Sequence, residues 1–349
     1  MTEQNQTTPL TFHPIRPQDT EGLLWRDQER EHPFARVPLS LRHLSHIHGN
    51  AMTTTGECCH FTTDSSRIAV RLELGEEKLQ EVIFGRFAYS GVDLYIFDDD
   101  ETHRWRWAST FTDYYAIKDQ HPEYLVIEGL PRRPRRCRLY YPMRNRMTAL
   151  SVGVEPDASF ELIPPRTDNL LVYYGTSIIH GAYSLRAGLG IAQLLARHLD
   201  LPLANLGFSG ACRLDPEMAA LLAQLHETRL LVIDPFHNVN PPLIRERLAA
   251  FLDVVCPALP QAQVVVVTSP SHLQSWLKPA LAAQQNEMHT LMHDITSERM
   301  TRYPNLHFID GHSLYGTDEV SPDGVHPNDT AAWNMALTLA TTIRPWLAP

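Results

Sequence analysis

The hydrophobic pattern of the chain changes near residue 165, and this change limits the folds open to it. Before that point short segments alternate apolar and polar residues; Ile68, Val70, Leu72 and Leu74 occupy every second position. A period of two is typical of strands with one buried face. After residue 165 the apolar runs are continuous and alternate with helical windows, which is typical of a parallel sheet covered on both faces. The sequence therefore predicts two differently built halves.

The first half is predicted to be an antiparallel β-sandwich, because many short strand candidates are separated by turn-forming clusters. Besides 67–74, the strand candidates are 94–97, 124–127, 138–141 and 150–154. Residues 163–169 carry two successive prolines, Pro164 and Pro165, and are predicted to form a stiff linker. We therefore expect a sandwich domain over residues 1–165 and a second domain over residues 166–349.

The second half is predicted to be a three-layer α/β/α domain with a parallel sheet. Its strand candidates are 170–174, 203–206, 230–233, 264–267 and 306–309. Its helix candidates are 188–199, 216–226, 241–255, 273–300 and 329–347.

Charge and cysteine content exclude several classes of function. The 349 residues carry a net charge of −10, which gives no overall basic field for nucleic acid or anionic lipid. No run approaches the roughly 18 apolar residues that a membrane span needs, and residues 1–14 lack the apolar core of a secretion signal. The five cysteines are odd in number and irregularly spaced, so we expect no disulfide framework and a cytoplasmic location.

Two motifs carry the chemistry. The first, Tyr174-Gly-Thr-Ser-Ile-Ile-His-Gly181, places Ser177 just after the first strand of the second half. The second places Asp323 three residues before His326. A serine hydroxyl becomes a good nucleophile when an imidazole held by a carboxylate removes its proton. Each motif alone fits an ordinary turn; together they indicate an ester-cleaving enzyme.

Two further loops follow the second and third strands of that half, at the same predicted edge of the sheet. They contain Gly210, in Asn-Leu-Gly-Phe-Ser-Gly, and Asn238, in Asp-Pro-Phe-His-Asn. A backbone N–H at Gly210 and the side-chain NH2 of Asn238 are suitable donors for the oxyanion of acyl transfer. Either residue alone is more typical of a turn or a loop cap.

These four segments, in this order, resemble the SGNH (GDSL-type) hydrolase superfamily over residues 168–349. Gly91-Val-Asp-Leu-Tyr95 matches the Gly-x-Asp-Leu-Tyr signature of a branch that carries an N-terminal β-sandwich. The resemblance implies Ser177 as nucleophile, His326 as base and acid, and Asp323 as the orienting carboxylate. It also implies an oxyanion hole formed by the N–H groups of Ser177 and Gly210 and the side chain of Asn238, with no cofactor and no metal.

The sequence departs from the family pattern at two positions near the predicted site. Thr176 stands where the family usually has aspartate, and His180 stands where this branch commonly has glutamine. His180 is predicted either to contact the substrate or to fill the loop, and His237 is a second substrate-binding candidate.

Two other sequence patterns are compatible with a metal site or a sugar-binding surface. Four histidines near predicted strand ends lack the spacing of a helical metal site, which argues against a catalytic metal. They are His237, His272, His307 and His312. Arg104-Trp-Arg-Trp107 would place two indoles on one face of a strand. Such indoles either stack on sugar rings or fill a sandwich core, and the core is the favoured interpretation.

We therefore predict a serine esterase that removes small acyl groups, most simply acetyl, from a small-molecule or glycan ester. An acyltransferase with an alcohol acceptor is the alternative within the same chemistry, and a non-catalytic carbohydrate-binding protein is the alternative outside it. Nucleic acid and membrane are not expected as partners, and a homo-oligomer is left open.

Overall fold

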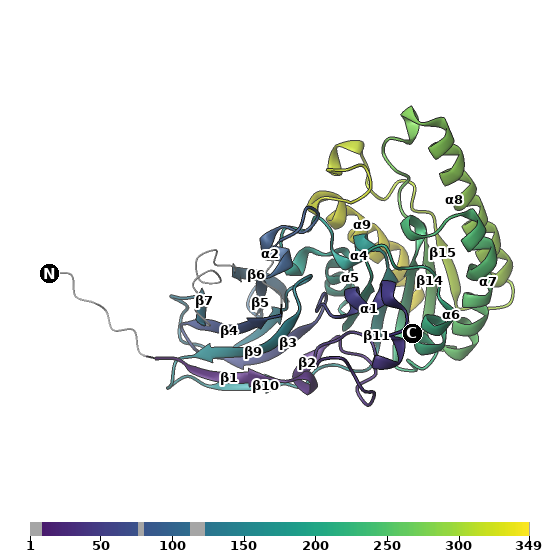
Figure 1. The fold of residues 1–349 in the computed structure, drawn as a ribbon. Helices are drawn as coiled ribbons and strands as arrows, with labels where there is room; N and C mark the ends of the chain where they lie inside the picture. The colour runs from purple at the N-terminus through teal and green to yellow at the C-terminus, as the bar shows by residue number, and fades with distance from the viewer. Residues whose placement is uncertain (1–8, 76–79, 112–122, 349) are drawn as a thin grey trace.

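The computed structural model describes residues 9–75, 80–111 and 123–348. Within them, antiparallel sheets make up the first half of the chain and a parallel sheet flanked by helices makes up the second (Figure 1). The predicted fold class is thus confirmed. Among the described helices, none is both long and apolar enough to span a membrane.

The first half contains two antiparallel sheets that enclose a core. One has the order β1-β9-β4-β7, with β1 at Thr11–Ile15, β9 at Met147–Val154, β4 at Ile68–Leu74 and β7 at Glu123–Ile127. The other has the order β10-β3-β8-β5-β6, with β10 at Phe160–Ile163, β3 at Cys58–Thr63, β8 at Arg135–Tyr140, β5 at Val92–Asp98 and β6 at Arg104–Phe111. The short strand β2 (Thr20–Glu21) also pairs with β3.

The second half contains a five-stranded parallel sheet with the order β12-β11-β13-β14-β15. The strands are β11 at Leu170–Gly175, β12 at Leu203–Gly207, β13 at Thr228–Asp234, β14 at Gln263–Val267 and β15 at Leu306–Ile309. The chain adds β12 on one side of β11 and then returns to add β13 on the other. Ligands of such sheets bind beyond the strand ends at this reversal, which marks the end of β11 as the place for a site.

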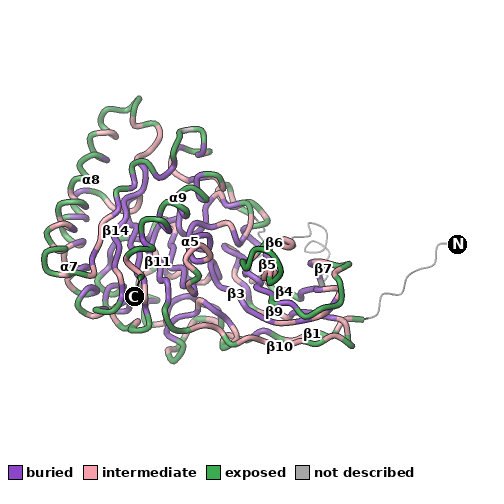
Figure 2. The backbone as a smooth tube through the Cα atoms, turned by 180° about the vertical axis from the view of Figure 1, so that it is seen from behind, coloured by how far each residue is buried: buried purple, intermediate pink, exposed green. Residues whose placement is uncertain are grey.

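Helices cover both faces of the parallel sheet. One face carries α6 (Pro216–Leu222), α7 (Pro241–Ala258) and α8 (Pro279–Met300), and the other carries α5 (Ile191–Leu199) and α9 (Asp329–Ile343). The buried strands between exposed helix faces are visible in Figure 2. The predicted helix at 216–226 ends earlier than expected, and the one at 329–347 ends in a 3-10 turn at Arg344–Leu347.

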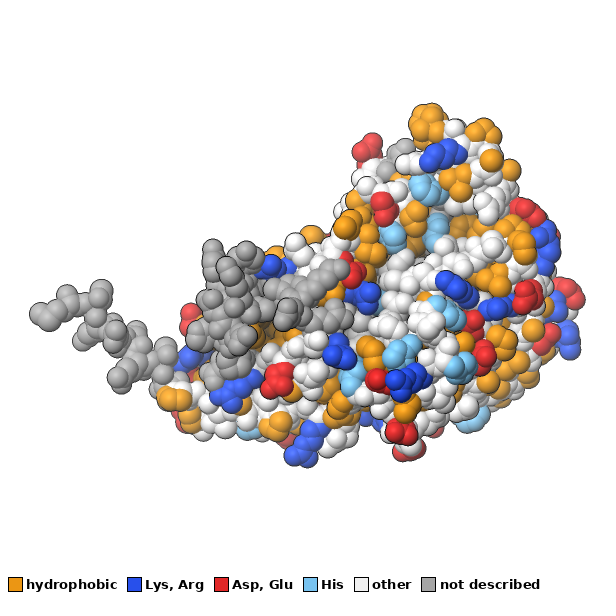
Figure 3. Space-filling model, in the orientation of Figure 1, with side chains coloured by type: hydrophobic (Ala, Val, Ile, Leu, Met, Phe, Trp, Pro, Cys, Tyr) orange, Lys and Arg blue, Asp and Glu red, His pale blue; other side chains and the backbone are white. Residues whose placement is uncertain are grey.

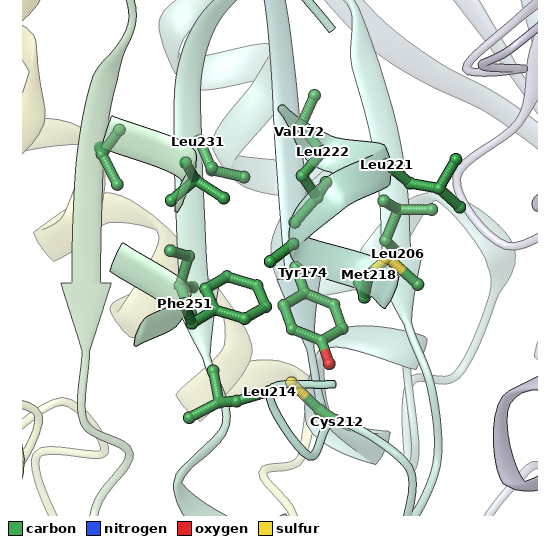
Figure 4. Close-up of a cluster of buried hydrophobic side chains, with 14 of the residues drawn as sticks. Val172, Tyr174, Leu206, Cys212, Leu214, Met218, Leu221, Leu222, Leu231 and Phe251 are labelled. Carbon is green, nitrogen blue, oxygen red and sulfur yellow. The ribbon is translucent and has the colours of Figure 1, made fainter. Parts of the chain in front are cut away.

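Both faces of β11 are buried, which explains its continuous apolar sequence. Val172 and Tyr174 belong to the core beneath α6 and α7, whereas Leu171 and Tyr173 belong to the core beneath α5 and α9. Figure 4 shows the ring of Tyr174 beside that of Phe251, and their ring centroids are 5.7 Å apart in a stacked arrangement. Burial of each such side chain stabilises the fold by roughly 1.5–3 kcal/mol.

The segment between β2 and β3 packs against the parallel-sheet half, which the sequence did not indicate. It includes the helix α1 (Ser45–Ala51), and its Trp25, Val37 and Ile47 join the core beneath α6. The indole of Trp25 donates a 3.2 Å hydrogen bond to the Leu221 carbonyl oxygen. Chain from the first half therefore helps to support the second, and the domain boundary at residues 165 and 166 stays a prediction.

The interpretation of Trp105 and Trp107 as core residues was wrong for Trp107. Its side chain is 54% exposed, and Trp105 is half-buried. Strand β6 is the edge strand of its sheet, and these two indoles point away from the sandwich interior. A side chain on the outer face of an edge strand can remain open to solvent.

Candidate active site

Ser177 begins the short helix α4 (Ser177–His180), directly after β11. The Thr176 hydroxyl oxygen accepts the Ile178 N–H at 3.3 Å and so caps this helix. Gly207, at the end of β12, lets the helix approach closely, because a Cβ at this position would lie 2.2 Å from the His180 nitrogen. The serine is thereby held at the edge of the sheet, 8% exposed.

The structure brings Ser177, His326 and Asp323 together. The Ser177 Oγ lies 2.7 Å from the His326 Nε2, and the His326 Nδ1 lies 2.7 Å from the Asp323 Oδ2. These two contacts form a continuous hydrogen-bonded chain from hydroxyl to imidazole to carboxylate. Such a chain can take the proton of the hydroxyl and stabilise the imidazolium that results.

Local hydrogen bonds keep Asp323 ionised. Partial burial opposes ionisation, but the backbone N–H of His326, its ring and the backbone N–H of Val325 all donate to the carboxylate. Their combined effect lowers the pKa of Asp323. The same bonds fold residues 323–326 into a tight turn that fixes the imidazole.

The turn is also fixed from outside. The Tyr315 hydroxyl donates to the Val325 carbonyl oxygen, and the Leu273 N–H donates to the Gly324 carbonyl oxygen at 2.8 Å. Gly324 has a φ of +85°, and a Cβ there would lie 2.7 Å from the His272 ring. A glycine is therefore required at this position.

Gly210 and Asn238 follow β12 and β13, the two neighbours of β11. Gly210 has a φ of +70° and open space where a Cβ would lie. The Asn238 Oδ1 accepts the Cys212 N–H at 3.1 Å, which links the two loops. Because the amide oxygen is engaged, the NH2 group is the end of Asn238 that can donate to a ligand.

His180 is placed inside the protein. It is fully buried, and its ring nitrogens lie 3.1 Å from the hydroxyls of Thr53 and Ser209 and from the Met143 carbonyl oxygen. Burial, together with the nearby Arg36, lowers its pKa well below the usual value, so the ring is neutral. This placement favours the loop-filling alternative over contact with substrate.

His237 lies nearer to the imidazole of His326. Its Nε2 is 3.0 Å from the Pro270 carbonyl oxygen, and the side chain is only partly exposed. Burial lowers its pKa to about 4, and the nearby His326 contributes in the same direction. It is therefore neutral near pH 7 and remains a substrate-contact candidate. Figure 3 shows several histidine side chains gathered on one face of the molecule.

Two residues of this region were missed by the sequence analysis because neither belongs to a recognisable motif. Arg36 is buried and donates to the carbonyl oxygens of Asn205 and Gly207, at 2.8 and 3.0 Å. Tyr183 has its ring centroid 5.7 Å from that of His326, and its N–H donates to the Ile83 carbonyl oxygen at 2.7 Å. Residues of the first half thus support the end of β12, through Arg36, and the segment after α4, through Ile83.

Two groups of described side chains have the ligand types for a metal ion. Glu21, Cys58 and His60 form a buried group, and His289, Asp310 and His312 form a second one that includes a histidine not singled out by sequence. In the first, the guanidinium of Arg166 lies 3.3 Å from Glu21, and its charge would repel a metal cation. In the second, the rings of His289 and His312 are stacked 3.4 Å apart. We assign no catalytic metal to either group.

The model of the GDSL-like lipase/acylhydrolase family matches residues 168–344. The chain belongs to this family. A second model, for the N-terminus of SGNH-hydrolase-type esterases and named after the Gly-x-Asp-Leu-Tyr motif, matches residues 11–160. The predicted resemblance is thereby confirmed, and the protein is a GDSL-type esterase. No curated protein sequence matches the chain.

Solved structures share the fold of this GDSL-type esterase over nearly its whole length. One is a GDSL-like lipase from Bacteroides ovatus, with a TM-score of 0.84 and 23% identity, covering 97% of this chain and 98% of that one. The salicylyl-acyltransferase SsfX3 from a tetracycline biosynthetic pathway has a TM-score of 0.74 and 21% identity, covering 96% and 97%. The acetyl xylan esterase Est2A from the rumen bacterium Butyrivibrio proteoclasticus has a TM-score of 0.56 and 13% identity, covering 97% and 99%.

Proposed function

We propose that the protein is a serine esterase that removes small acyl groups, such as acetyl, from esters of carbohydrates. The observation that carries this proposal is the hydrogen-bonded chain from Ser177 through His326 to Asp323. The carbohydrate part is supported by the fold shared with an acetyl xylan esterase.

The reaction would begin when Ser177 Oγ attacks the ester carbonyl carbon and His326 takes its proton. Negative charge develops on the carbonyl oxygen, where the N–H groups of Ser177 and Gly210 and the NH2 group of Asn238 can donate to it. Each such donor typically lowers the barrier by about 3 kcal/mol. Asp323 holds the imidazole and stabilises its charged form.

Collapse of the tetrahedral intermediate would break the bond to the sugar oxygen, which leaves with the proton held by His326. The acyl group is then attached to Ser177. His326 next removes a proton from water, and the resulting attack releases the carboxylic acid and restores the serine.

Replacement of Ser177 by alanine tests this proposal. We expect turnover of p-nitrophenyl acetate to fall by about 10³-fold or more, while the melting temperature changes little because only one oxygen is lost. A serine hydrolase probe of the fluorophosphonate type should label the parent protein and leave Ser177→Ala unlabelled. Unchanged turnover in the variant would remove Ser177 as the nucleophile.

Acyl transfer to an alcohol is the second candidate, supported by the fold shared with a salicylyl-acyltransferase. It uses the same acyl-enzyme with an alcohol in place of water. Product analysis with added acceptor alcohols separates the two: an esterase yields mainly free acid, whereas a transferase yields mainly the new ester.

We also propose a reducing, cytoplasmic location. All five cysteines are buried free thiols, and cysteines that remain unpaired are typical of reducing compartments.

A further inference from the structure

A groove lies between the sandwich and the helices α5 and α9, and none of the residues Ser177, Asp323 and His326 lines it. Its volume is about 490 Å³, which is within the range of sites for small ligands. Strands β5 and β6 form one wall. Interfaces between two structural units are common positions for binding sites.

Four aromatic rings form the wall on the sandwich side. Tyr95 pairs with Trp107 across β5 and β6, and Phe97 pairs with Trp105. Trp333 lines the opposite side from α9 and is 47% exposed, while Trp107 is 54% exposed. Exposed indoles on both sides of a groove offer flat apolar surfaces for the C–H faces of sugar rings.

Arginines lie among these rings. Arg186 and Arg197 contact the Tyr95 ring, with distances of 5.5 and 4.4 Å from guanidinium carbon to ring centroid. Arg186 is paired with the buried Asp93 at 2.5 Å. Arg197 donates to the Gly188 carbonyl oxygen and the Tyr140 hydroxyl, and not to a carboxylate among the described residues.

The charge of the groove is opposite to that of the whole chain. The chain has a net charge of −10, yet the groove is lined by Arg104, Arg106, Arg186 and Arg197 and by only one acid, Asp200. Arg106 is paired with Asp98 at 3.0 Å. The guanidinium of Arg104 forms no ion pair with any residue that the structure describes. Positive charge is therefore available at this place for an anionic ligand.

A second cavity of about 310 Å³ continues this surface, since both are lined by Phe97, Trp105 and Asp200. It adds Arg136, Arg138 and Arg166, together with the buried acid Glu21, which pairs with Arg166 at 3.3 Å. The Nε of Arg138 and the Nη2 of Arg166 are buried without a hydrogen-bond partner in the described structure. Buried donors without partners are costly, so these two N–H groups are suited to donate to an oxygen of a bound sugar. Because Glu21 already lies beside these guanidinium groups, the free positive charge is that of Arg104 and Arg197 in the first groove.

We propose that this groove binds an oligosaccharide that carries carboxylates, such as a chain containing uronic acid residues. The indoles of Trp107 and Trp333 stack on the sugar rings, and the guanidinium groups of Arg104 and Arg197 bind the carboxylates. The ligand needs both sugar rings and carboxylates. A neutral sugar would not pair with the arginines, and a small anion would not cover the aromatic rings.

The groove is connected to the site through the segment that follows α4. Tyr183 on this segment approaches His326, and Arg186 on the same segment lines the groove. Between them, the Leu185 N–H donates to Asp329 at the start of α9, at 3.1 Å. A glycan held in the groove would thus contact the same segment that borders Ser177 and His326. Binding in the groove does not itself require the proposed esterase activity.

Isothermal titration calorimetry on the full chain tests this proposal with hexagalacturonate and neutral cellohexaose as probes. We expect hexagalacturonate to bind more tightly, with an affinity that falls as salt rises. Trp107→Ala should weaken its binding by about tenfold or more, and Trp107→Phe should restore most of it. Arg104→Gln should weaken the binding of hexagalacturonate alone. Trp276→Ala is the matched control, because this indole is 78% exposed and lies outside the groove.

Turnover of p-nitrophenyl acetate should be unchanged in Trp107→Ala and Arg104→Gln. A wrong assignment of the groove can therefore be distinguished from a wrong assignment of the esterase activity. Equal affinity for the two oligosaccharides would overturn the proposal, as would equal loss in Trp276→Ala or no binding at all. A dimer in analytical ultracentrifugation that Trp107→Ala dissociates would instead assign this face to a second copy of the chain.

Discussion

The guanidinium of Arg36 donates a 2.8 Å hydrogen bond to the carbonyl oxygen of Asn205, 169 positions further along the chain. The same group also donates to the carbonyl oxygens of Gly207, Asn50 and Thr53. Asn205 in turn donates to the Ile179 carbonyl oxygen at 2.8 Å, next to the helix turn that begins at Ser177. A buried cation from the first half therefore holds the strand end that supports Ser177.

Replacement of Arg36 by methionine should lower the free energy of unfolding by about 3 kcal/mol or more, because three buried carbonyl oxygens and one partly buried carbonyl oxygen lose their donor. Chemical denaturation measures this loss. The matched control is Arg42→Met, since the Arg42 side chain is 67% exposed and pairs weakly with Glu31 at 3.9 Å. An equal effect in the two variants would contradict the role given to Arg36.

Gly207→Ala should damage the site without removing any functional group. The added Cβ would lie 2.2 Å from the His180 nitrogen and 2.5 Å from the Ile179 carbonyl carbon, so α4 must move. Overpacking of this kind costs about 1–3 kcal/mol, and a displacement of Ser177 by about 1 Å can reduce kcat about 100-fold. Gly49→Ala is the control, because Gly49 is exposed on α1 with nothing within 4 Å of the new Cβ. Full activity in Gly207→Ala would refute the argument.

Asp323→Asn should reduce kcat by up to about 10⁴-fold, because an amide no longer selects the imidazole tautomer that accepts the serine proton. Steady-state kinetics with p-nitrophenyl acetate measures the effect. Asp310→Asn is a suitable control: Asp310 contacts the ring of His312 at 2.6 Å in a similar pair that the proposed reaction does not use. If Asp323→Asn kept more than a tenth of the parent kcat, Asp323 would not be the orienting carboxylate.

Asp234, at the end of β13, should make stability depend on pH. Burial raises its pKa from 3.8 to about 7, although hydrogen bonds from Ser269 and from the Phe236 N–H oppose the shift. The folded state therefore binds this proton more tightly than the unfolded state, and its stabilising effect is present at low pH and lost as pH rises toward 7.

The parent chain, compared with Asp234→Asn, should lose about 3 kcal/mol of stability between pH 5 and pH 8. Urea denaturation of both proteins at the two pH values measures the difference. Serine hydroxyl donation to the side chain is preserved in the variant, since an amide oxygen also accepts. A difference between the proteins that stays constant with pH would show that Asp234 is ionised throughout.

Local patterns in the sequence predicted much of the fold. The alternation in 67–74 corresponds to β4, with Ile68, Val70 and Leu72 buried and Arg71 and Glu73 exposed. The continuous apolar run before Ser177 corresponds to β11, buried on both faces. These patterns are readable because the side-chain period of a strand depends only on neighbours a few residues away.

The candidate site was predicted in part. Ser177, Asp323 and His326 belong to short motifs that are typical of serine hydrolases. The structure places Ser177 within hydrogen-bonding distance of His326, and His326 within hydrogen-bonding distance of Asp323. Their catalytic roles, and those of Gly210 and Asn238, stay predictions until the variants are measured. His180 carried no signal that separates a substrate contact from a buried support.

By itself, the sequence determined the two kinds of sheet and the motif residues, because both follow from local spacing. Only the tertiary structure decided that Arg36 supports the end of β12, that His180 is buried, and that Trp107 faces a groove lined by arginines. Those outcomes depend on contacts between residues that are distant in the chain. Such contacts depend on how the two halves of the chain pack together, and the local hydrophobic pattern of the sequence does not predict that packing.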